Sequence, residues 1–199
     1  MKYLILLILA KCLITLFDMS LNVQFDTQPI LQTEDYLLLP VKEEDFEAVY
    51  AAASDPEVWS QHPNKNRWQR DVFCNFFEGA LQSGGAFKII DKKKDVVIGS
   101  TRIYDYNTKD NSVLIGYTFF AKAYWGCGAN QAVKTLMLDY LFQYVDKVIF
   151  HIGSLNMRSK ISIERLGAVK TGELDIAYHG EPVRHNDIYV ITKESWMNR

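Results

Sequence analysis

A short run of small residues, from Gly126 to Asn130, is the part of the sequence best suited to chemistry. It reads Gly-Cys-Gly-Ala-Asn and follows an aromatic pair, Tyr124 and Trp125. Small residues leave backbone N–H groups uncovered, and the helix expected next adds the positive end of its dipole. Such a turn can bind a phosphate or pyrophosphate. The alternative is a glycine-bearing loop before an ordinary core helix, because short glycine patterns are common.

Cys127, inside this turn, could instead act as a covalent nucleophile, since a helix N-terminus favours the thiolate form. However, no His or Asp lies near it in the sequence to assist such a reaction. Together with Cys12 and Cys74 it forms an odd set without metal-ligand spacing, so neither a disulfide framework nor a metal site is indicated. We therefore expect a reducing compartment, the cytoplasm.

The flanks of the turn predict the elements that position it. Residues 112–120 are rich in β-branched and aromatic side chains, which is typical of a buried strand. After the turn, apolar residues recur at steps of three and four and predict an amphipathic helix; they are Val133, Leu136, Met137, Tyr140, Leu141 and Tyr144. The order is strand, glycine turn, helix.

The remaining sequence indicates one globular domain over residues 21–199. The chain has 199 residues, of which 48% are hydrophobic and 23% charged, enough to form a sizeable core. Further helices are expected over 42–53, 67–82 and 156–166, and further strands over 35–40, 86–90, 96–104, 147–152, 168–178 and 188–192. A net charge of −2 without a basic run argues against a nucleic-acid partner.

The apolar leader, residues 1–20, does not match the rest of the chain. Its run from Tyr3 to Phe17 is interrupted by Lys11 and is shorter than the ~20 apolar residues that span a bilayer. It could be a membrane or export segment, a buried extra helix, or translation from a start upstream of the true one. The third interpretation is favoured, because Met19 and Ser20 open a polar stretch into an ordinary domain. Membrane association is not expected.

The combination of these features is more specific than any part. Strand, Trp-Gly-x-Gly turn and helix are followed by a strand, Asn156-x-x-Ser159 and Glu164-Arg-Leu-Gly-Ala168. From about residue 33 to 196 this resembles the GNAT superfamily of acetyl-CoA-dependent N-acetyltransferases, and most of all its branch of ribosomal-protein N-terminal alanine acetyltransferases. The resemblance implies an α+β fold in α/β/α layers. Its mixed, mostly antiparallel sheet of seven strands would be flanked by about four helices and splayed between strands four and five, 112–120 and 147–152.

The resemblance also implies acetyl-CoA as co-substrate, without a metal. The pyrophosphate would bind the turn residues Trp125, Gly126, Cys127, Gly128, Ala129 and Asn130, and the pantetheine arm would pair with the backbone near Phe119, Phe120 and Ala121. Asn130 departs from the Gly or Ala of the superfamily pattern. It should be tolerated if its N–H points inward, since backbone amides bind the pyrophosphate.

Two residues of the following helix would lie beside the sulfur end of the cofactor, Asn156 and Ser159. Ser159 could donate a hydrogen bond to the leaving thiolate, as a general acid. The alternative makes Asn156 only a helix N-cap, with Ser159 at N3.

The general base is harder to assign, because many relatives carry a Glu where this chain has Leu114. Its possible substitutes are His62, Asp105, Glu173, His179 and Asp187, of which His62 and Asp187 are our candidate catalytic residues. Trp59, His62, Tyr104 and Tyr106 are expected to line the acceptor pocket, with both tyrosines on one face of a strand by alternation.

These features predict an N-acetyltransferase that acts by direct attack of a primary amine on acetyl-CoA. The acceptor would be a small molecule or a protein N-terminus, and the enzyme a monomer or homodimer. The alternative, prompted by Leu114, is a non-catalytic acyl-CoA-binding or sensing module of the same fold.

Overall fold

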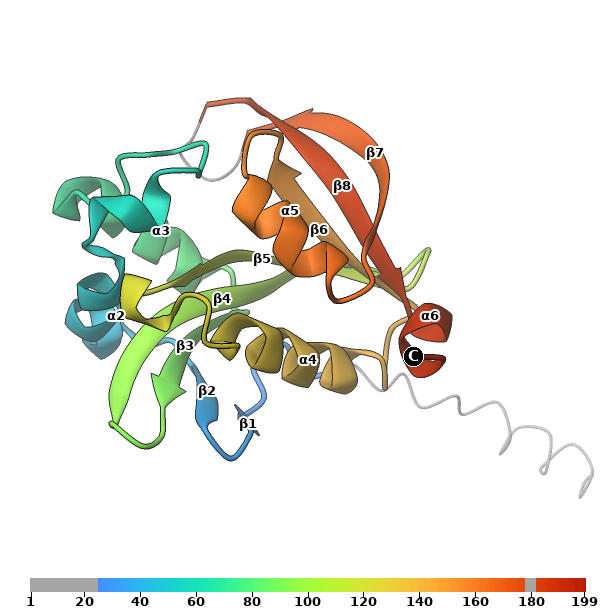
Figure 1. Cartoon of the computed structure of the whole chain (residues 1–199), viewed down its shortest axis with the longest axis horizontal. Coiled ribbons are helices and arrows are strands. Elements are labelled where there is room, and N and C mark those ends of the chain that lie inside the picture. Colours follow the sequence, from blue (N-terminus) through green and yellow to red (C-terminus); the bar gives the residue numbers. More distant parts are fainter. Residues whose placement is uncertain (1–24, 178–181) are drawn as a thin grey trace, which may run out of the picture.

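The chain folds around one mixed sheet with helices on both faces (Figure 1). A computed structural model describes residues 25–177 and 182–199; the apolar leader and His179 lie outside these residues. The strand order is β1-β2-β3-β4-β5-β6-β8-β7. The strands are β1 Leu31–Gln32, β2 Tyr36–Pro40, β3 Ala86–Asp91, β4 Val96–Asn107, β5 Ser112–Phe120, β6 Lys147–Gly153, β7 Val169–Ile176 and β8 Arg184–Thr192. Every neighbouring pair is antiparallel except β5 with β6.

Five α-helices and three short 3-10 turns lie within the described residues. The helices are α2 Phe46–Ala53, α3 Arg70–Gln82, α4 Ala129–Leu141, α5 Met157–Glu164 and α6 Lys193–Met197; the turns are η1 Glu43–Asp45, η2 Pro56–Trp59 and η3 Lys122–Tyr124. In Figure 1, α4 and α5 lie in front of the sheet and α3 behind it. None of these helices is long and apolar enough to cross a membrane.

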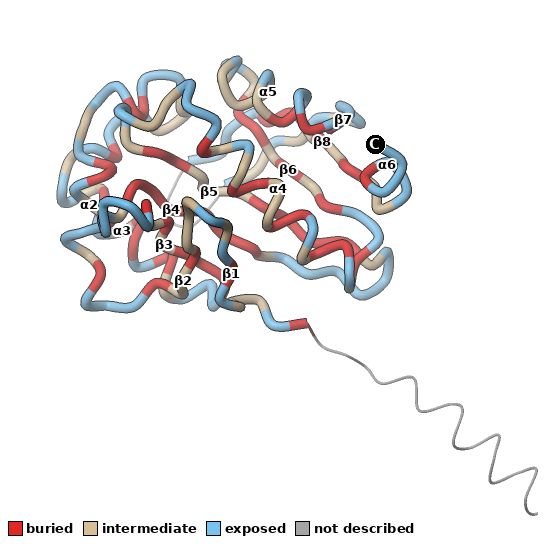
Figure 2. The backbone as a smooth tube through the Cα atoms, turned by 60° about the horizontal axis from the view of Figure 1, so that its bottom comes forward, coloured by how far each residue is buried: buried red, intermediate tan, exposed pale blue. Residues whose placement is uncertain are grey.

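Two buried clusters hold the helices to the sheet. The larger packs α4 against the strands, through residues such as Val133 and Met137. The smaller packs α2 and α3 around Phe73. Phe119 belongs to the smaller cluster and its neighbour Phe120 to the larger, as side chains on opposite faces of a strand should. Figure 2 shows the buried stretches running along the central strands and α4. The expected α/β/α layering is therefore confirmed.

Within the described ranges the sheet has eight strands rather than the expected seven. The additional strand, Leu31–Gln32, pairs with β2 and has only two residues, too few to show an alternating pattern. The last strand begins at Arg184 rather than 188, so Asp187 lies within the strand. The five-residue helix α6 was not expected; the Thr192 side chain caps it by accepting the Ser195 N–H.

The sheet splays between β5 and β6, as expected. The two strands pair in parallel at only three positions, Ser112 with Lys147, Val113 with Val148 and Leu114 with Ile149. β6 remains paired with β8 as far as Gly153. On the other side, a register shift between β4 and β5 and a left-handed Tyr117, with φ 52°, bend β5 away. β5 and β6 therefore separate from each other while β5 stays paired with β4 and β6 with β8.

Phe73 anchors the smaller cluster, and its removal tests the packing of α3. Its side chain is fully buried, whereas the next residue, Cys74, is exposed. We expect Phe73→Ala to lower the free energy of unfolding by about 3–5 kcal/mol through lost burial and a cavity. Cys74→Ala should change it by no more than about 0.5 kcal/mol. Urea denaturation measures both, and equal effects would contradict this packing.

Candidate active site

A cavity of about 540 Å³ occupies the space where β5 and β6 part. Residues 115–120 of β5 form one wall and residues 150–153 of β6 the other. The loop after η2 also lines the cavity, through His62 and Pro63. It lies close against β6, since an added Cβ on Gly153 would lie 2.4 Å from Pro63 Cγ. The volume is within the range of small-molecule sites, ~300–1,000 Å³. The cavity is therefore a consequence of the splay, enclosed by elements from both halves of the chain.

The glycine turn forms one border of this cavity, with Gly126, Gly128, Asn130 and Gln131 in its lining. Gly126 and Gly128 have left-handed backbones, with φ 73° and 86°, although a Cβ on either would meet no atom within 4 Å. Glycine is thus favoured here by conformation rather than by lack of space. Gly128 is the N-cap of α4, and no side chain caps the first N–H groups of that helix. An anion could accept hydrogen bonds from them.

Asn130 joins the turn to α5. Its Nδ2 donates to Ser162 Oγ at 2.7 Å. Its Oδ1 is buried and has no hydrogen-bond partner among the described residues. An orphaned buried acceptor is costly, so a ligand N–H or hydroxyl at this point would stabilise the site. The departure from Gly or Ala thus adds a polar group on the wall of the cavity.

The other residues expected to hold the cofactor are only partly brought together. Trp125, Phe119 and Phe120 line the cavity. The Trp125 indole donates to the Phe120 carbonyl at 3.0 Å and lies under the Arg158 guanidinium, 3.9 Å from the ring centre. The remaining three do not line it: Ala121 donates its N–H to Ile98, Cys127 is exposed with its thiol donating to Tyr124, and Ala129 is fully buried in the larger cluster.

Asn156 and Ser159 both line the cavity at the start of α5. Asn156 is also the N-cap, since its Oδ1 accepts the backbone N–H of Ser159 at 3.2 Å. The Ser159 hydroxyl makes no hydrogen bond to a described residue. The capping role is therefore carried by the Ser159 backbone, and its hydroxyl remains available to a ligand.

His62 lines the cavity beside Trp59, in edge-to-face contact at 5.6 Å between ring centres. The Asn64 N–H donates to its Nδ1 at 3.0 Å, and Arg67 Nη1 lies 3.1 Å from its Nε2. Burial, and then the positive charge of Arg67, hold the pKa of His62 well below its usual range. The ring is therefore kept neutral.

The two tyrosines expected on one face are separated. Tyr104 lines the cavity, whereas Tyr106 is 41% exposed and packs edge-to-face on Phe25, with its hydroxyl donating to Asn111. A register shift between Tyr104 and Asn107, with a left-handed Asp105 of φ 52°, breaks the alternation between them. Sequence periodicity cannot detect such a bulge.

Asp187 is buried on β8 but does not line the cavity. Its carboxylate forms ion pairs with Lys160 and, at 2.9 Å, with Lys170. Hydrogen bonding from these ammonium groups lowers the pKa of Asp187, which weakens it as a base. Glu173, also considered as a base, is paired with Lys170 outside the cavity.

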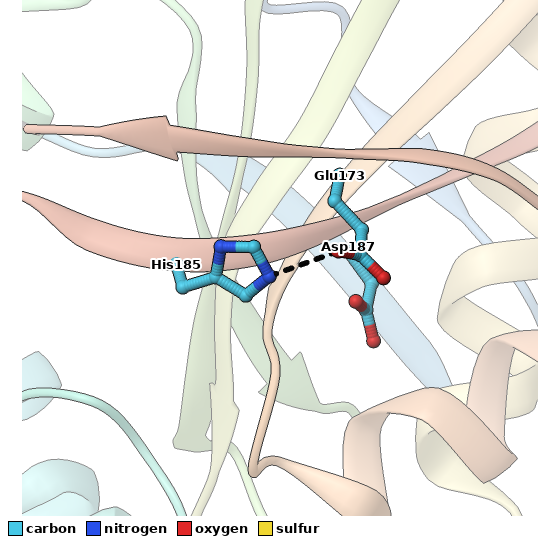
Figure 3. A group of neighbouring side chains, drawn as sticks. All are labelled: Glu173, His185 and Asp187. Carbon is cyan, nitrogen blue, oxygen red and sulfur yellow. Dashed lines mark hydrogen bonds and ion pairs between the residues drawn. The ribbon is translucent and has the colours of Figure 1, made fainter.

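Glu173, His185 and Asp187 lie side by side on β7 and β8, with ligand atoms within 4.8 Å of one another (Figure 3). This arrangement could suggest a metal site. However, the ammonium groups of Lys160 and Lys170 already neutralise the Asp187 carboxylate, and His185 pairs with Asp175 at 2.8 Å as well as with Glu173. The group is accounted for as an ion-pair network.

Sequence reasoning missed several residues of the cavity wall. His151 lines the cavity from β6, two residues after Ile149, the last residue that pairs with β5. Burial lowers the pKa of His151, and the charge of Asp105 opposes that effect. The expected splay could have indicated His151, because residues of the strand 147–152 beyond the split must face the opening. Five basic side chains also line the cavity, and no Asp or Glu does so among the described residues: Arg67, Lys134, Arg158, Arg165 and Arg184.

Comparison with known proteins agrees with this geometry. A family model for an acetyltransferase (GNAT) domain matches residues 36–169. The search of curated proteins gave no match.

Solved structures share the fold. A GCN5-related N-acetyltransferase from Brucella melitensis is 17% identical, with a TM-score of 0.74 over 85% of this chain and 81% of that one. A protein named as an acetyltransferase from T. thermophilus is 25% identical, with a TM-score of 0.70 over 85% and 92%. A protein named as a ribosomal-protein-serine acetyltransferase from Vibrio cholerae is 12% identical, with a TM-score of 0.65 over 84% and 99%.

The ion pair of Asp187 predicts a pH-dependent contribution to stability. Because its folded pKa is lowered, the carboxylate stabilises the fold above its unfolded pKa of about 3.9, and this is lost as pH falls through the folded value. We expect Asp187→Asn to lower the free energy of unfolding by roughly 3 kcal/mol at pH 7, since Lys160 loses its partner. In urea titrations the deficit should shrink below about pH 4, and a constant deficit would contradict this account.

Proposed function

Because the chain belongs to the GNAT family of acetyltransferases, whose members use acetyl-CoA, we propose that it transfers the acetyl group to a primary amine. The acceptor is a small molecule or a protein N-terminus. The observation that carries this proposal is the cavity in the splay of the sheet, with an uncapped helix N-terminus at one border and Ser159 in its wall. Its four arginine side chains suit a ligand that carries several phosphate charges.

The turn and the wall of the cavity would divide the binding between them. The N–H groups from Gly126 to Asn130 receive the pyrophosphate, because they combine a positive dipole end with uncovered donors. β5 beyond Leu114 has no parallel partner, so its edge can pair with the amides of the pantetheine arm. In this proposal the thioester lies between β5, β6 and α5, which line the cavity.

The chemistry is direct attack of a neutral amine on the thioester carbonyl. Backbone N–H groups polarise the carbonyl oxygen, and Ser159 donates its hydroxyl hydrogen bond to the departing thiolate. His62 and His151 are the histidines of the described wall, and an imidazole can accept a proton from the amine near neutral pH, directly or through water. Of these His151 is favoured, because Arg67 disfavours a proton on His62.

A narrower acceptor class is favoured by the sequence of the turn and of α5. Trp125-Gly126 and the Asn156/Ser159 pair are the features shared with ribosomal-protein N-terminal acetyltransferases, so protein N-termini come first in an acceptor screen. Release of CoA is measured over peptides with ribosomal-protein N-termini, small amines and polyamines. Binding of acetyl-CoA without turnover on any of them would instead favour a sensing module, the role that Leu114 in place of an acid suggests.

Gly128→Val tests the pyrophosphate site. The change forces a β-branched residue into a left-handed backbone and moves the first N–H groups of α4. We expect acetyl-CoA affinity to fall at least ~10-fold, about 1.4 kcal/mol, in calorimetry. Gly167→Val is the matched control, since Gly167 is also left-handed, with φ 92°, but lies outside the cavity. Equal affinity losses in both variants would show that the turn does not bind the pyrophosphate. If the wild type does not bind acetyl-CoA, the proposed function is overturned.

Ser159→Ala tests the general acid without disturbing the helix cap, because the cap uses the backbone N–H of Ser159. We expect kcat to fall by about 10²-fold with the KM for acetyl-CoA nearly unchanged, since the hydroxyl acts on the departing thiolate. Ser159→Thr, which keeps a hydroxyl, should recover part of the rate. If the alanine variant turns over as fast as the wild type, the serine has only a structural role.

A further inference from the structure

Lys88, Lys160 and Lys134 are lysines with little exposed side-chain surface, and they differ in what surrounds their charge. Lys88 is paired with Asp45 at 2.5 Å, and Lys160 is paired with Asp187. Lys134, only 3% exposed, forms no ion pair with a carboxylate of the described residues. Its Nζ contacts two hydroxyls, Thr118 Oγ1 at 2.6 Å and Thr101 Oγ1 at 3.1 Å. Carboxylates therefore neutralise the first two lysines, and nothing comparable neutralises the third.

An ammonium without a counter-ion is expensive to bury, and the side chain responds by releasing its proton. Burial alone lowers the pKa of Lys134 to about 7. A neutral primary amine has two N–H donors and one lone pair. The two threonine hydroxyls, 2.8 Å apart, can accept both N–H groups. The lone pair is then left without a donor among these contacts, which is the state that a nucleophile requires.

The position of this amine connects it to the cavity. Lys134 extends from α4, one turn after Asn130, and it lines the cavity together with Thr118 of β5. Thr118 immediately precedes Phe119 and Phe120 on the wall to which we assign the pantetheine arm. A lysine that is closed to bulk solvent therefore borders the same cavity as the glycine turn and Ser159.

We propose that Lys134 is itself an acetyl acceptor, a self-acetylation site supplied by the acetyl-CoA bound in this cavity. The inference rests on the proposed function. The Nζ lone pair attacks the thioester carbonyl, an N–C bond forms and the C–S bond breaks. CoA leaves as the thiolate and takes up the proton that the nitrogen loses. The product is an amide, which cannot be reprotonated at neutral pH and so keeps the buried position uncharged.

The modification has a consequence for the site. The acetyl group adds volume to the wall of the cavity beside Thr118, where the next acetyl-CoA would bind. Acetylated protein should therefore bind acetyl-CoA more weakly than unmodified protein. Self-acetylation would act as a brake that responds to the supply of acetyl-CoA in the absence of an external amine.

The test is peptide mass spectrometry of the full chain after incubation with isotope-labelled acetyl-CoA, with calorimetry on the same preparation. We expect label on Lys134 and suppression of that label by excess CoA. A small reagent in bulk solution, acetic anhydride, should instead label exposed lysines such as Lys93 and leave Lys134 behind. Gly128→Val should lower the labelling of Lys134 about 10-fold, in step with its affinity loss. Lys134→Met, which keeps an unbranched apolar chain, is the unlabelled control.

The outcomes separate the two proposals. Binding of acetyl-CoA without label on Lys134 overturns self-acetylation and leaves the proposed function intact. Labelling of Lys134 that CoA does not suppress and Gly128→Val does not reduce also overturns it, because the acetyl group would then come from solution. Failure of the wild type to bind acetyl-CoA overturns the proposed function together with the inference.

Discussion

The early end of parallel pairing between β5 and β6 is the constraint on which the rest of the site depends. Three paired positions hold the strands together, and beyond Leu114 and Ile149 each strand is supported only from its other side. Unpaired backbone groups of an open strand edge favour association with another extended chain. The same opening makes room for the cavity, receives the N-terminus of α5 and exposes residues of β6 that would otherwise be covered by β5.

The second organising feature is the distribution of charge around the opening. Acidic side chains on β7 and β8 form ion pairs with lysines, as Asp187 does with Lys160 and Lys170. The described wall of the cavity carries basic side chains without acids. An anionic ligand is thus favoured inside, while the stabilising ion pairs lie outside. Lys134 is an exception among these basic side chains, because burial lowers its pKa to about 7 and so favours the neutral amine.

The two halves of the chain contribute unequally to the cavity. The C-terminal half supplies the turn, α4, β6 and α5, while η2 and the loop after it contribute Trp59, His62 and Pro63 to the lining. Arg158 fastens them together, with its side chain donating to the Val58 carbonyl at 3.1 Å and its backbone N–H to Gln61 Oε1 at 3.0 Å. Acceptor selectivity is therefore expected to depend on contacts that cross between the halves.

Local sequence patterns determined the elements and the turn of this protein. Enrichment in β-branched and aromatic residues predicted the β5 strand, and periodicity of three and four predicted α4. The small residues of the turn include Gly126 and Gly128, which adopt left-handed backbones. These features depend on neighbours in the chain, so the sequence records them directly. Asn156 is similar, because a cap needs only the N–H three residues on.

Only the tertiary structure decided which side chains face the cavity. The bulge at Asp105 directs the side chains of Tyr104 and Tyr106 to different environments. Two lysines distant in sequence form ion pairs with the Asp187 carboxylate. His151 lines the cavity because β5 leaves β6 just before it. Burial lowers the pKa of Lys134, whose Nζ contacts threonine hydroxyls of β4 and β5 rather than carboxylates. Register, burial and electrostatic partners arise from segments far apart in the chain, and no local pattern encodes them.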